Sequence, residues 1–99
     1  MTKTYLVGQI TLTNPEGYAG YQAQVPQIVA DFGGKYLVRG GHTTQLEGQS
    51  QGDRNVVIEF PSRQMAEAWY NSPAYQAILP HRQNNSVGHL VFVDGYSAA

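Results

Sequence analysis

The sequence contains no cysteine, so disulfides, thiolate catalysis and cysteine-ligated zinc sites are all excluded. No apolar run approaches the roughly 20 residues that a membrane span needs. The first dozen residues alternate like a strand and lack the apolar segment and cleavage site of a secretory signal peptide. These absences predict a soluble, cytoplasmic protein with no membrane partner.

Charge is also scarce, because charged residues make up 13% of the chain, whereas about 25% is usual. The six Lys and Arg residues are scattered and form no basic stripe, which argues against nucleic acid as a partner. Phosphate loops, dinucleotide fingerprints and the G-x-S-x-G motif of serine hydrolases are missing as well. The sequence therefore implies no cofactor.

The length of 99 residues predicts a single domain over residues 1–99. A chain of this size buries only roughly two thirds of the surface that it exposes when unfolded. A deep cavity beside a full hydrophobic core is therefore hard to fit, and association of two copies would relieve that limit.

The first third of the chain predicts a strand followed by a helix. Residues 4–12 alternate with apolar residues on both faces, as in a strand covered on two sides. Asn14 and Pro15 form a helix start, and apolar residues then recur at helical spacing. Pro26 lies inside this helix and is expected to kink it. Gly33 can end the helix, because glycine adopts positive φ without strain.

A hairpin is predicted next. Residues 35–46 are rich in Tyr, Leu, Val and Thr and indicate a long strand. Residues 49–53 are polar and contain glycine, as turns do, and residues 55–60 form the return strand.

The last third of the chain predicts two helical segments and a strand. Ser62 is placed to cap the first helix, and Ser72 repeats the signal before a short turn that Pro80 ends. Residues 87–93 then form the last strand.

The element order βαββαβ predicts an α+β fold with a four-stranded antiparallel sheet in the order 4-1-3-2 and both helices on one face. The other face has no helix to cover it. Exposed apolar sheets of this size normally mark an interface. We therefore expect a homodimer, packed sheet to sheet about a two-fold axis. The apolar residues expected on the open face are Tyr5, Val7, Val57, Val91 and Val93, or their alternating neighbours.

One cross-strand pair is expected in the hairpin. If the turn centres near Gln49, Arg39 lies opposite Glu59, and their charges attract. The pair either belongs to a functional site or is structural alone, because ion pairs often serve folding. Gly40 and Gly41 remove side chains beyond Arg39, which suits a β-bulge or the close approach of a ligand or backbone.

Three segments, GGKYLVRGG, IEFPS and AWYNSPAYQ, occur in one order and spacing that resembles the bacterial domain-of-unknown-function 1330 family. The resemblance spans nearly the whole chain. It implies a dimeric α+β barrel with a ferredoxin-like fold, but no reaction, because the family is itself uncharacterised. Relatives of this fold include cofactor-independent monooxygenases, haem-degrading enzymes and muconolactone-type isomerases, but likeness of fold alone does not carry a function.

A pocket between sheet and helices is the expected ligand site. Tyrosines and a tryptophan give an apolar body with polar tips, and arginine offers a fork for a carboxylate. Together they suit a small aromatic or carboxylate ligand, although the aromatic residues also fit an ordinary core. The expected ligand-binding residues are Arg39, Trp69, Tyr75, Arg82, Tyr18 and Tyr21.

Candidate bases are fewer. His42 and His89 are predicted on opposite edge strands, so one chain cannot bring both to one metal ion, although a dimer could. The histidines show no metal-ligand spacing, and no metal site is expected. His81 beside Arg82 is the better general base, unless it is a solvent-exposed loop residue. Glu59 is the other candidate for that role.

Three functions remain open from the sequence. The chain is a cofactor-independent enzyme of the monooxygenase or isomerase type that acts on a small aromatic or carboxylate compound, a binding module with the same pocket, or a structural dimerisation domain. An enzyme needs a base with a perturbed pKa within reach of a substrate proton, whereas a binding module needs neither.

Overall fold

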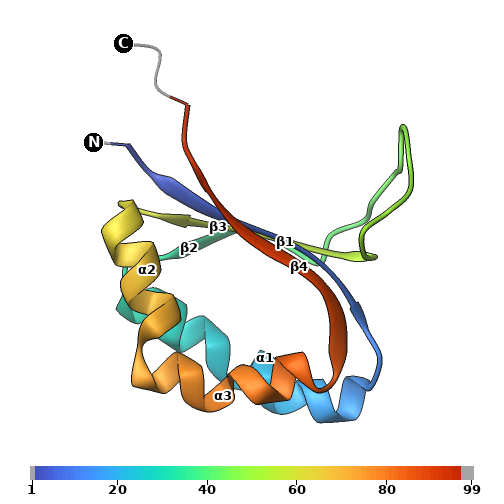
Figure 1. Ribbon diagram of the computed structural model, residues 1–99, viewed down its shortest axis with the longest axis horizontal. Coiled ribbons are helices and arrows are strands. Elements are labelled where there is room, and N and C mark those ends of the chain that lie inside the picture. The colour runs from blue at the N-terminus through green and yellow to red at the C-terminus, as the bar shows by residue number, and fades with distance from the viewer. Residues whose placement is uncertain (1, 97–99) are drawn as a thin grey trace.

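The computed structural model describes residues 2–96, which form seven elements. The helices and strands follow one another along the chain in the predicted order, with the second helical region divided in two (Figure 1). Their bounds are β1 (Thr4–Leu12), α1 (Pro15–Asp31), β2 (Lys35–Arg39), β3 (Arg54–Phe60), α2 (Arg63–Asn71), α3 (Pro73–Gln83) and β4 (Ser86–Asp94).

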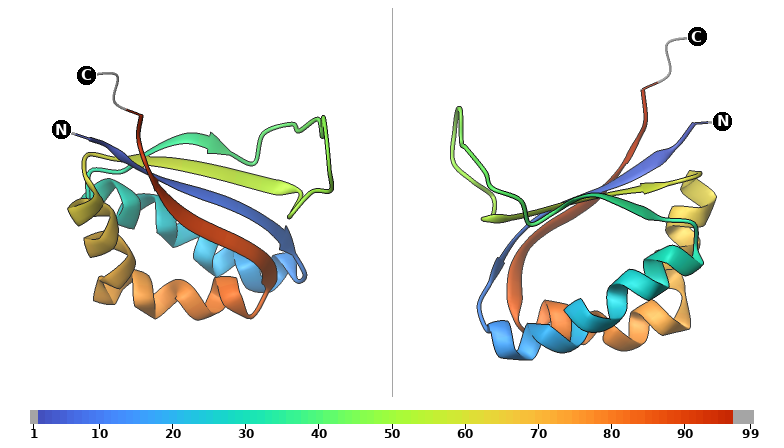
Figure 2. Two further views of the ribbon diagram at one scale, coloured as in Figure 1. Left: turned by 45° about the horizontal axis from the view of Figure 1, so that its top comes forward. Right: turned by 180° about the vertical axis from the view of Figure 1, so that it is seen from behind.

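The four strands form one antiparallel sheet in the order β2-β3-β1-β4. This is the predicted order read from the opposite edge. The three helices cover one face of the sheet and leave the other face open (Figures 1 and 2). The predicted βαββαβ architecture is therefore confirmed.

Two of the three predicted capping residues cap their helices through the side chain, whereas Asn14 precedes α1 without a side-chain capping hydrogen bond. The Ser62 hydroxyl accepts a hydrogen bond from the Met65 amide at 3.2 Å, and the Ser72 hydroxyl accepts one from the Tyr75 amide at 3.1 Å. The prediction that Pro80 ends the last helical segment is wrong, because α3 continues to Gln83. Proline removes one donor only, and the helix beyond it closes when the Asn84 amide donates to the Pro80 carbonyl.

The prediction of a long strand over residues 35–46 is also wrong, because β2 ends at Arg39. A bulge separates Tyr36 from Val38, and Gly40 follows with a φ of 72°. Glycine tolerates this left-handed conformation, which turns the chain away from β3. Residues 40–53 form an irregular arm that projects on the side of the sheet away from the helices (Figures 1 and 2).

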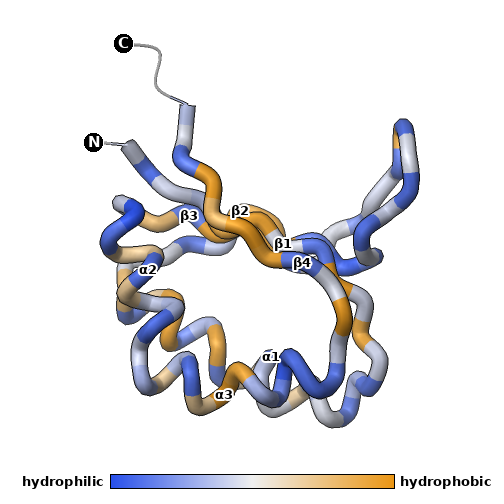
Figure 3. Tube along the Cα trace, in the orientation of Figure 1, coloured by the Kyte–Doolittle hydropathy of each residue, from blue (hydrophilic) through white to orange (hydrophobic). Residues whose placement is uncertain are grey.

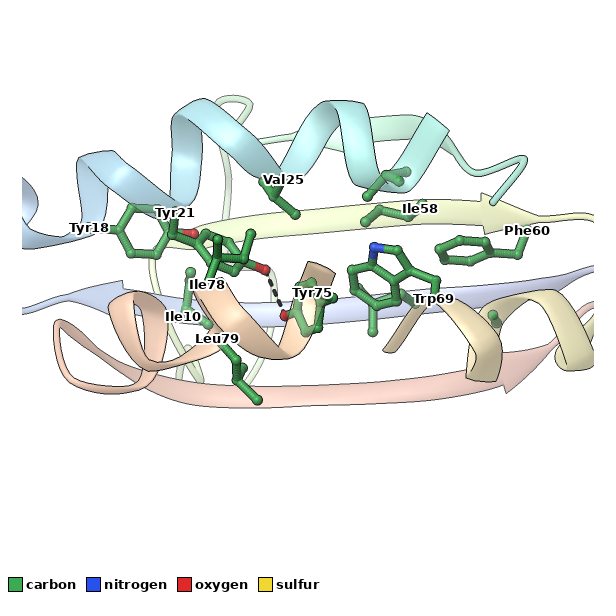
Figure 4. Close-up of a cluster of buried hydrophobic side chains, with 13 residues drawn as sticks. Ile10, Tyr18, Tyr21, Val25, Ile58, Phe60, Trp69, Tyr75, Ile78 and Leu79 are labelled. Atoms are coloured by element: carbon green, nitrogen blue, oxygen red, sulfur yellow. Dashed lines mark hydrogen bonds between the residues drawn. The ribbon is translucent and has the colours of Figure 1, made fainter. Parts of the chain in front are cut away.

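The core lies between the sheet and the helices and is built around aromatic rings (Figure 4). Trp69 and Tyr75 are fully buried, with ring centroids 4.3 Å apart, and Phe60 packs against the other side of Trp69 at 5.3 Å. The Tyr21 and Tyr75 hydroxyls share a buried hydrogen bond of 2.8 Å. Rings at these distances stabilise the core beyond their buried area.

The open face of the sheet carries a row of four valines, one from each strand. The strand registers place Val38 beside Val57, Val57 beside Val7, and Val7 beside Val91. Val91 is 53% exposed. The chain trace coloured by hydropathy shows apolar residues concentrated in the strands (Figure 3). The prediction of an apolar face without helices is therefore confirmed.

Candidate functional site

A cavity of about 30 Å³ lies between the sheet and the helices. Three arginines and three tyrosines contribute to its wall, together with apolar residues of the strands and of α1. The polar or charged residues that line it are Tyr18, Tyr21, Gln22, Tyr36, Arg39, Arg54 and Arg82.

Arg54 is the first residue of β3, and strand alternation places it on the helix-covered face with Val56 and Ile58. Its guanidinium lies against Gly40, where a Cβ atom would come within 2.6 Å of Arg54 Nη1. The Arg54 Nε atom is buried and has no hydrogen-bond partner among residues 2–96. Sequence analysis missed Arg54, although its alternation with the buried residues of β3 was a usable signal.

Arg39 reaches the same cavity from β2. Its Nη2 atom donates a hydrogen bond of 3.0 Å to the backbone carbonyl of Gln22 in α1. That carbonyl lacks its usual helical partner, because the residue four positions later is Pro26, which has no N–H. The Arg39 guanidinium also lies 5.1 Å from the Tyr36 ring, within the range of a cation–π contact. Arg39 therefore ties the edge strand to α1 at the wall of the cavity.

The predicted pairing of Arg39 with Glu59 is wrong. Lys35 lies opposite Glu59, and Arg39 lies opposite Val56 on the helix-covered face. The bulge in β2 and the long arm set this register, in place of the turn centred near Gln49. Glu59 lies on the other face of the sheet.

Glu59 has partners of its own there. Its carboxylate accepts hydrogen bonds from Lys3 Nζ at 3.2 Å and from the Tyr5 hydroxyl at 3.1 Å. The hydrogen bond from Lys3 holds the pKa of Glu59 below its usual value. Glu59 therefore forms an ionised polar cluster outside the cavity.

Arg82 lies in the last turn of α3, between the cavity and a wider groove. The groove has a volume of about 410 Å³ and opens beside edge strand β4, where Tyr70, Leu90 and Phe92 contribute to its wall. The Arg82 guanidinium carbon lies 6.0 Å from the centre of the Tyr21 ring. The Arg82 Nε atom, like that of Arg54, is buried without a hydrogen-bond partner in the described part of the chain.

The tyrosines of the cavity are neutral hydrogen-bonding groups. Burial raises the pKa values of Tyr18, Tyr21 and Tyr36 above the ordinary value of 10.0. The Arg54 and Arg82 charges oppose this effect at Tyr18, but burial outweighs them. The phenols therefore stay protonated at neutral pH and supply no negative charge to the arginines.

None of the seven acidic residues, all of which fall within residues 2–96, lines the cavity. The ion pairs in this range involve other cations, which are Lys3 with Glu59 and Arg63 with both Glu67 and Asp94. Three of the four arginines therefore surround one cavity without a carboxylate partner in the described part of the chain. Such an arrangement attracts an anion.

The structure brings together four of the residues expected from the sequence, namely Arg39, Arg82, Tyr18 and Tyr21. Trp69 and Tyr75 are fully buried in the core and do not line the cavity. His81 is exposed on α3 and does not line it either. Besides Arg54, sequence analysis missed Tyr36, which alternates with Lys35 and Leu37 in β2 and faces the helices.

The remaining histidines lie apart, with His42 exposed on the arm and His89 exposed on β4. Within residues 2–96, no group of three or more His, Cys, Asp or Glu side chains is placed to hold a metal ion. No helix in this part of the chain is both long and apolar enough to cross a membrane.

The fold is that of a small α+β protein of the ferredoxin-like class, and solved structures share this fold. A dabb family protein with a ferredoxin-like fold from Mesorhizobium loti is 12% identical, with a TM-score of 0.56 and full coverage of both chains at 100%. The family model of the domain of unknown function DUF1330 matches residues 3–96, so the chain belongs to that family.

Two further structures show the same fold. A protein of unknown function from Rhodopseudomonas palustris is 20% identical, with a TM-score of 0.77 over 97% of this chain and 84% of that one. SnoaB, a cofactor-independent oxygenase from Streptomyces nogalater, is 11% identical, with a TM-score of 0.64 over 99% of this chain and 97% of that one. No curated protein matches the chain. At these identities the likeness establishes the fold and no activity.

Proposed function

We propose that this protein binds a small organic anion, such as an aromatic carboxylate, in the space between the sheet and the helices. One observation carries the proposal. Within residues 2–96, the Nε atoms of Arg54 and Arg82 are buried without a hydrogen-bond partner, and no acidic side chain lines their cavity. A buried donor left unpaired is costly, and a bound carboxylate removes that cost with charge-assisted hydrogen bonds.

The volumes of the cavity and of the groove indicate how such a ligand binds. The inner cavity of about 30 Å³ has room for a small group such as a carboxylate but not for an aromatic ring. The outer groove of about 410 Å³ falls within the range of roughly 300–1,000 Å³ that is usual for ligand pockets. Because Arg82 and Leu90 line both, the anionic group binds at Arg82 and the apolar body lies in the groove against Tyr70 and Phe92.

Turnover is not part of this proposal, because the described cavity wall carries no His, Asp or Glu that acts as a base at neutral pH. Glu59 and His81 lie outside the cavity, and a catalytic role for either residue stays a prediction. Binding accounts for the unpaired guanidinium groups without a reaction.

Titration with benzoate and with its neutral analogue benzamide tests the proposal. Trp69, the sole tryptophan, reports on the groove because its ring lies 6.1 Å from Tyr70 and 6.5 Å from Phe92. Benzoate should change the fluorescence at concentrations where benzamide does not. Arg82→Gln should weaken benzoate binding by about 1.5–3 kcal/mol, the value of a hydrogen bond to a charged group.

Arg63→Gln is the matched control, because Arg63 is exposed and already paired with Glu67 and Asp94. It should leave benzoate binding unchanged. Equal responses to benzoate and benzamide, or equal losses in the two arginine variants, would contradict the proposal.

We also propose that the protein is a homodimer joined through the open sheet face. The observation in favour is the row formed by Val38, Val57, Val7 and Val91, which crosses all four strands. A continuous apolar row on an uncovered sheet favours burial against a second copy, and identical faces suit a two-fold axis.

A further inference from the structure

The cavity carries more positive charge than one carboxylate neutralises. Arg39, Arg54 and Arg82 all line it, and no acidic residue of the described chain does. We propose that the natural ligand carries two anionic groups, one bound by Arg82 and the other by Arg54 with Arg39 beside it. This inference rests on the proposed function, because it specifies the chemical class of the ligand in the same site.

Arg54 and Arg82 approach the cavity from different directions. Arg54 begins β3, opposite Ile10 of the central strand β1, and its guanidinium lies against the base of the arm at Gly40. Arg82 comes from the last turn of α3 and also lines the outer groove, whereas Arg54 does not. A single carboxylate at the groove side therefore pairs with Arg82 and leaves the Nε of Arg54 without a partner.

The described part of the protein supplies no internal substitute for the second anion. The phenols of Tyr18 and Tyr36, which are the polar neighbours of Arg54 and Arg39, have raised pKa values and remain protonated at neutral pH. Arg39 has a neutral partner, the Gln22 carbonyl, which satisfies a donor without cancelling the charge. A second anionic group on the ligand would satisfy the buried donor of Arg54 and offset this remaining charge.

The unmodified protein provides the first test. The three isomers of benzenedicarboxylate are compared with their half-amides, which have almost the same shape but one charge fewer, and with benzoate. Because the spacing of the anionic groups differs among the isomers, at least one should bind about tenfold more tightly than its half-amide, the effect expected of one added charge-assisted contact.

Variants then assign the effect to Arg54. In Arg54→Gln, the ratio of dicarboxylate affinity to half-amide affinity should fall close to one. In Arg63→Gln, the ratio should stay as in the unmodified protein, because Arg63 lies outside the cavity. If Arg54→Gln fails to fold, Arg54→Lys replaces it, because lysine keeps the charge but lacks the guanidinium fork. The affinity ratio should then fall but stay above one.

The outcomes separate this inference from the proposed function. If benzoate and the half-amides bind as tightly as every dicarboxylate, the ligand needs only one anionic group, so the inference is overturned while the proposed function stands. If none of the acids binds, both fail. A dicarboxylate preference that survives in Arg54→Gln would also overturn the inference.

Discussion

Arg54 owes its position in the cavity to the glycine that follows the neighbouring strand β2. Gly40 has a φ of 72°, and its amide donates a hydrogen bond of 2.8 Å to the Asn55 carbonyl. This bond fixes the base of the arm beside Arg54. It also leaves the space that the Arg54 guanidinium occupies. A single residue without a side chain thus determines both the backbone turn and the position of a cationic group.

Gly40→Ala should therefore weaken both stability and anion binding. The left-handed conformation costs a non-glycine residue about 1–2 kcal/mol, and the new methyl group displaces the guanidinium. Thermal melting and a benzoate titration measure the two effects. Gly41→Ala is the control, since its added Cβ meets no atom within 4 Å beyond the adjoining residues of the chain. Equal behaviour of the two variants would show that Gly40 does not position Arg54.

At the scale of elements, two prolines shape the site without breaking their helices. Pro26 leaves the Gln22 carbonyl of α1 free to accept the Arg39 hydrogen bond, and so connects α1 to β2. Pro80 lies inside α3, which continues to Gln83 and carries Arg82 to the cavity. Each helix loses one backbone hydrogen bond near a residue that lines the site.

The link between Pro26 and Arg39 predicts an energetic coupling. Arg39→Met should destabilise the protein by about 1 kcal/mol, because it removes the partner of a carbonyl that has no helical donor. The Pro26→Ala substitution restores a backbone N–H that can donate to that carbonyl, so Arg39→Met should cost less in this background. A double-mutant cycle in urea measures the difference. An equal cost in both backgrounds would refute the coupling.

The sequence predicted the sheet because its signals are local and repeated. Alternation in β1 and β4, the serine caps and the short connections all favour one topology. The register of β2 against β3 depends on a bulge at Leu37 and on the irregular arm, neither of which has a distinct sequence signature. Arg39 was therefore expected beside Glu59 and lies on the opposite face. Arg54 was missed because sequence analysis began its strand one residue later.

At the scale of the whole molecule, the two faces of the sheet have separate roles in our proposals. The helix-covered face carries the arginines and the cavity, and the open face carries the valine row. The arm of residues 40–53 projects on the open side (Figure 2). Of the four valines, Val91 also lines the outer groove. Val57 lines neither the cavity nor the groove, so a change there disturbs dimerisation without touching the ligand site.

Val57→Asp should convert the dimer to a monomer. Val57 lies in the middle of the valine row, so a carboxylate there would be buried without a partner when two sheets meet. Light scattering should give twice the chain mass of 10.9 kDa for the unmodified protein and the single mass for the variant. Ala68→Asp, at an exposed position of α2, is the control and should remain dimeric. A monomer mass for the unmodified protein at micromolar concentration would contradict the dimer.

The side-chain Nε–H resonances of the arginines test anion binding in the cavity most directly. The chain has four arginines, so their ¹H–¹⁵N signals can be assigned one by one with Arg→Lys variants. Titration with benzoate should shift the signal of Arg82 first, because that side chain lines both the groove and the cavity, and should leave the signal of Arg63 in place. If benzoate changes the Trp69 fluorescence but shifts neither the Arg54 nor the Arg82 signal, anion binding in this cavity is contradicted.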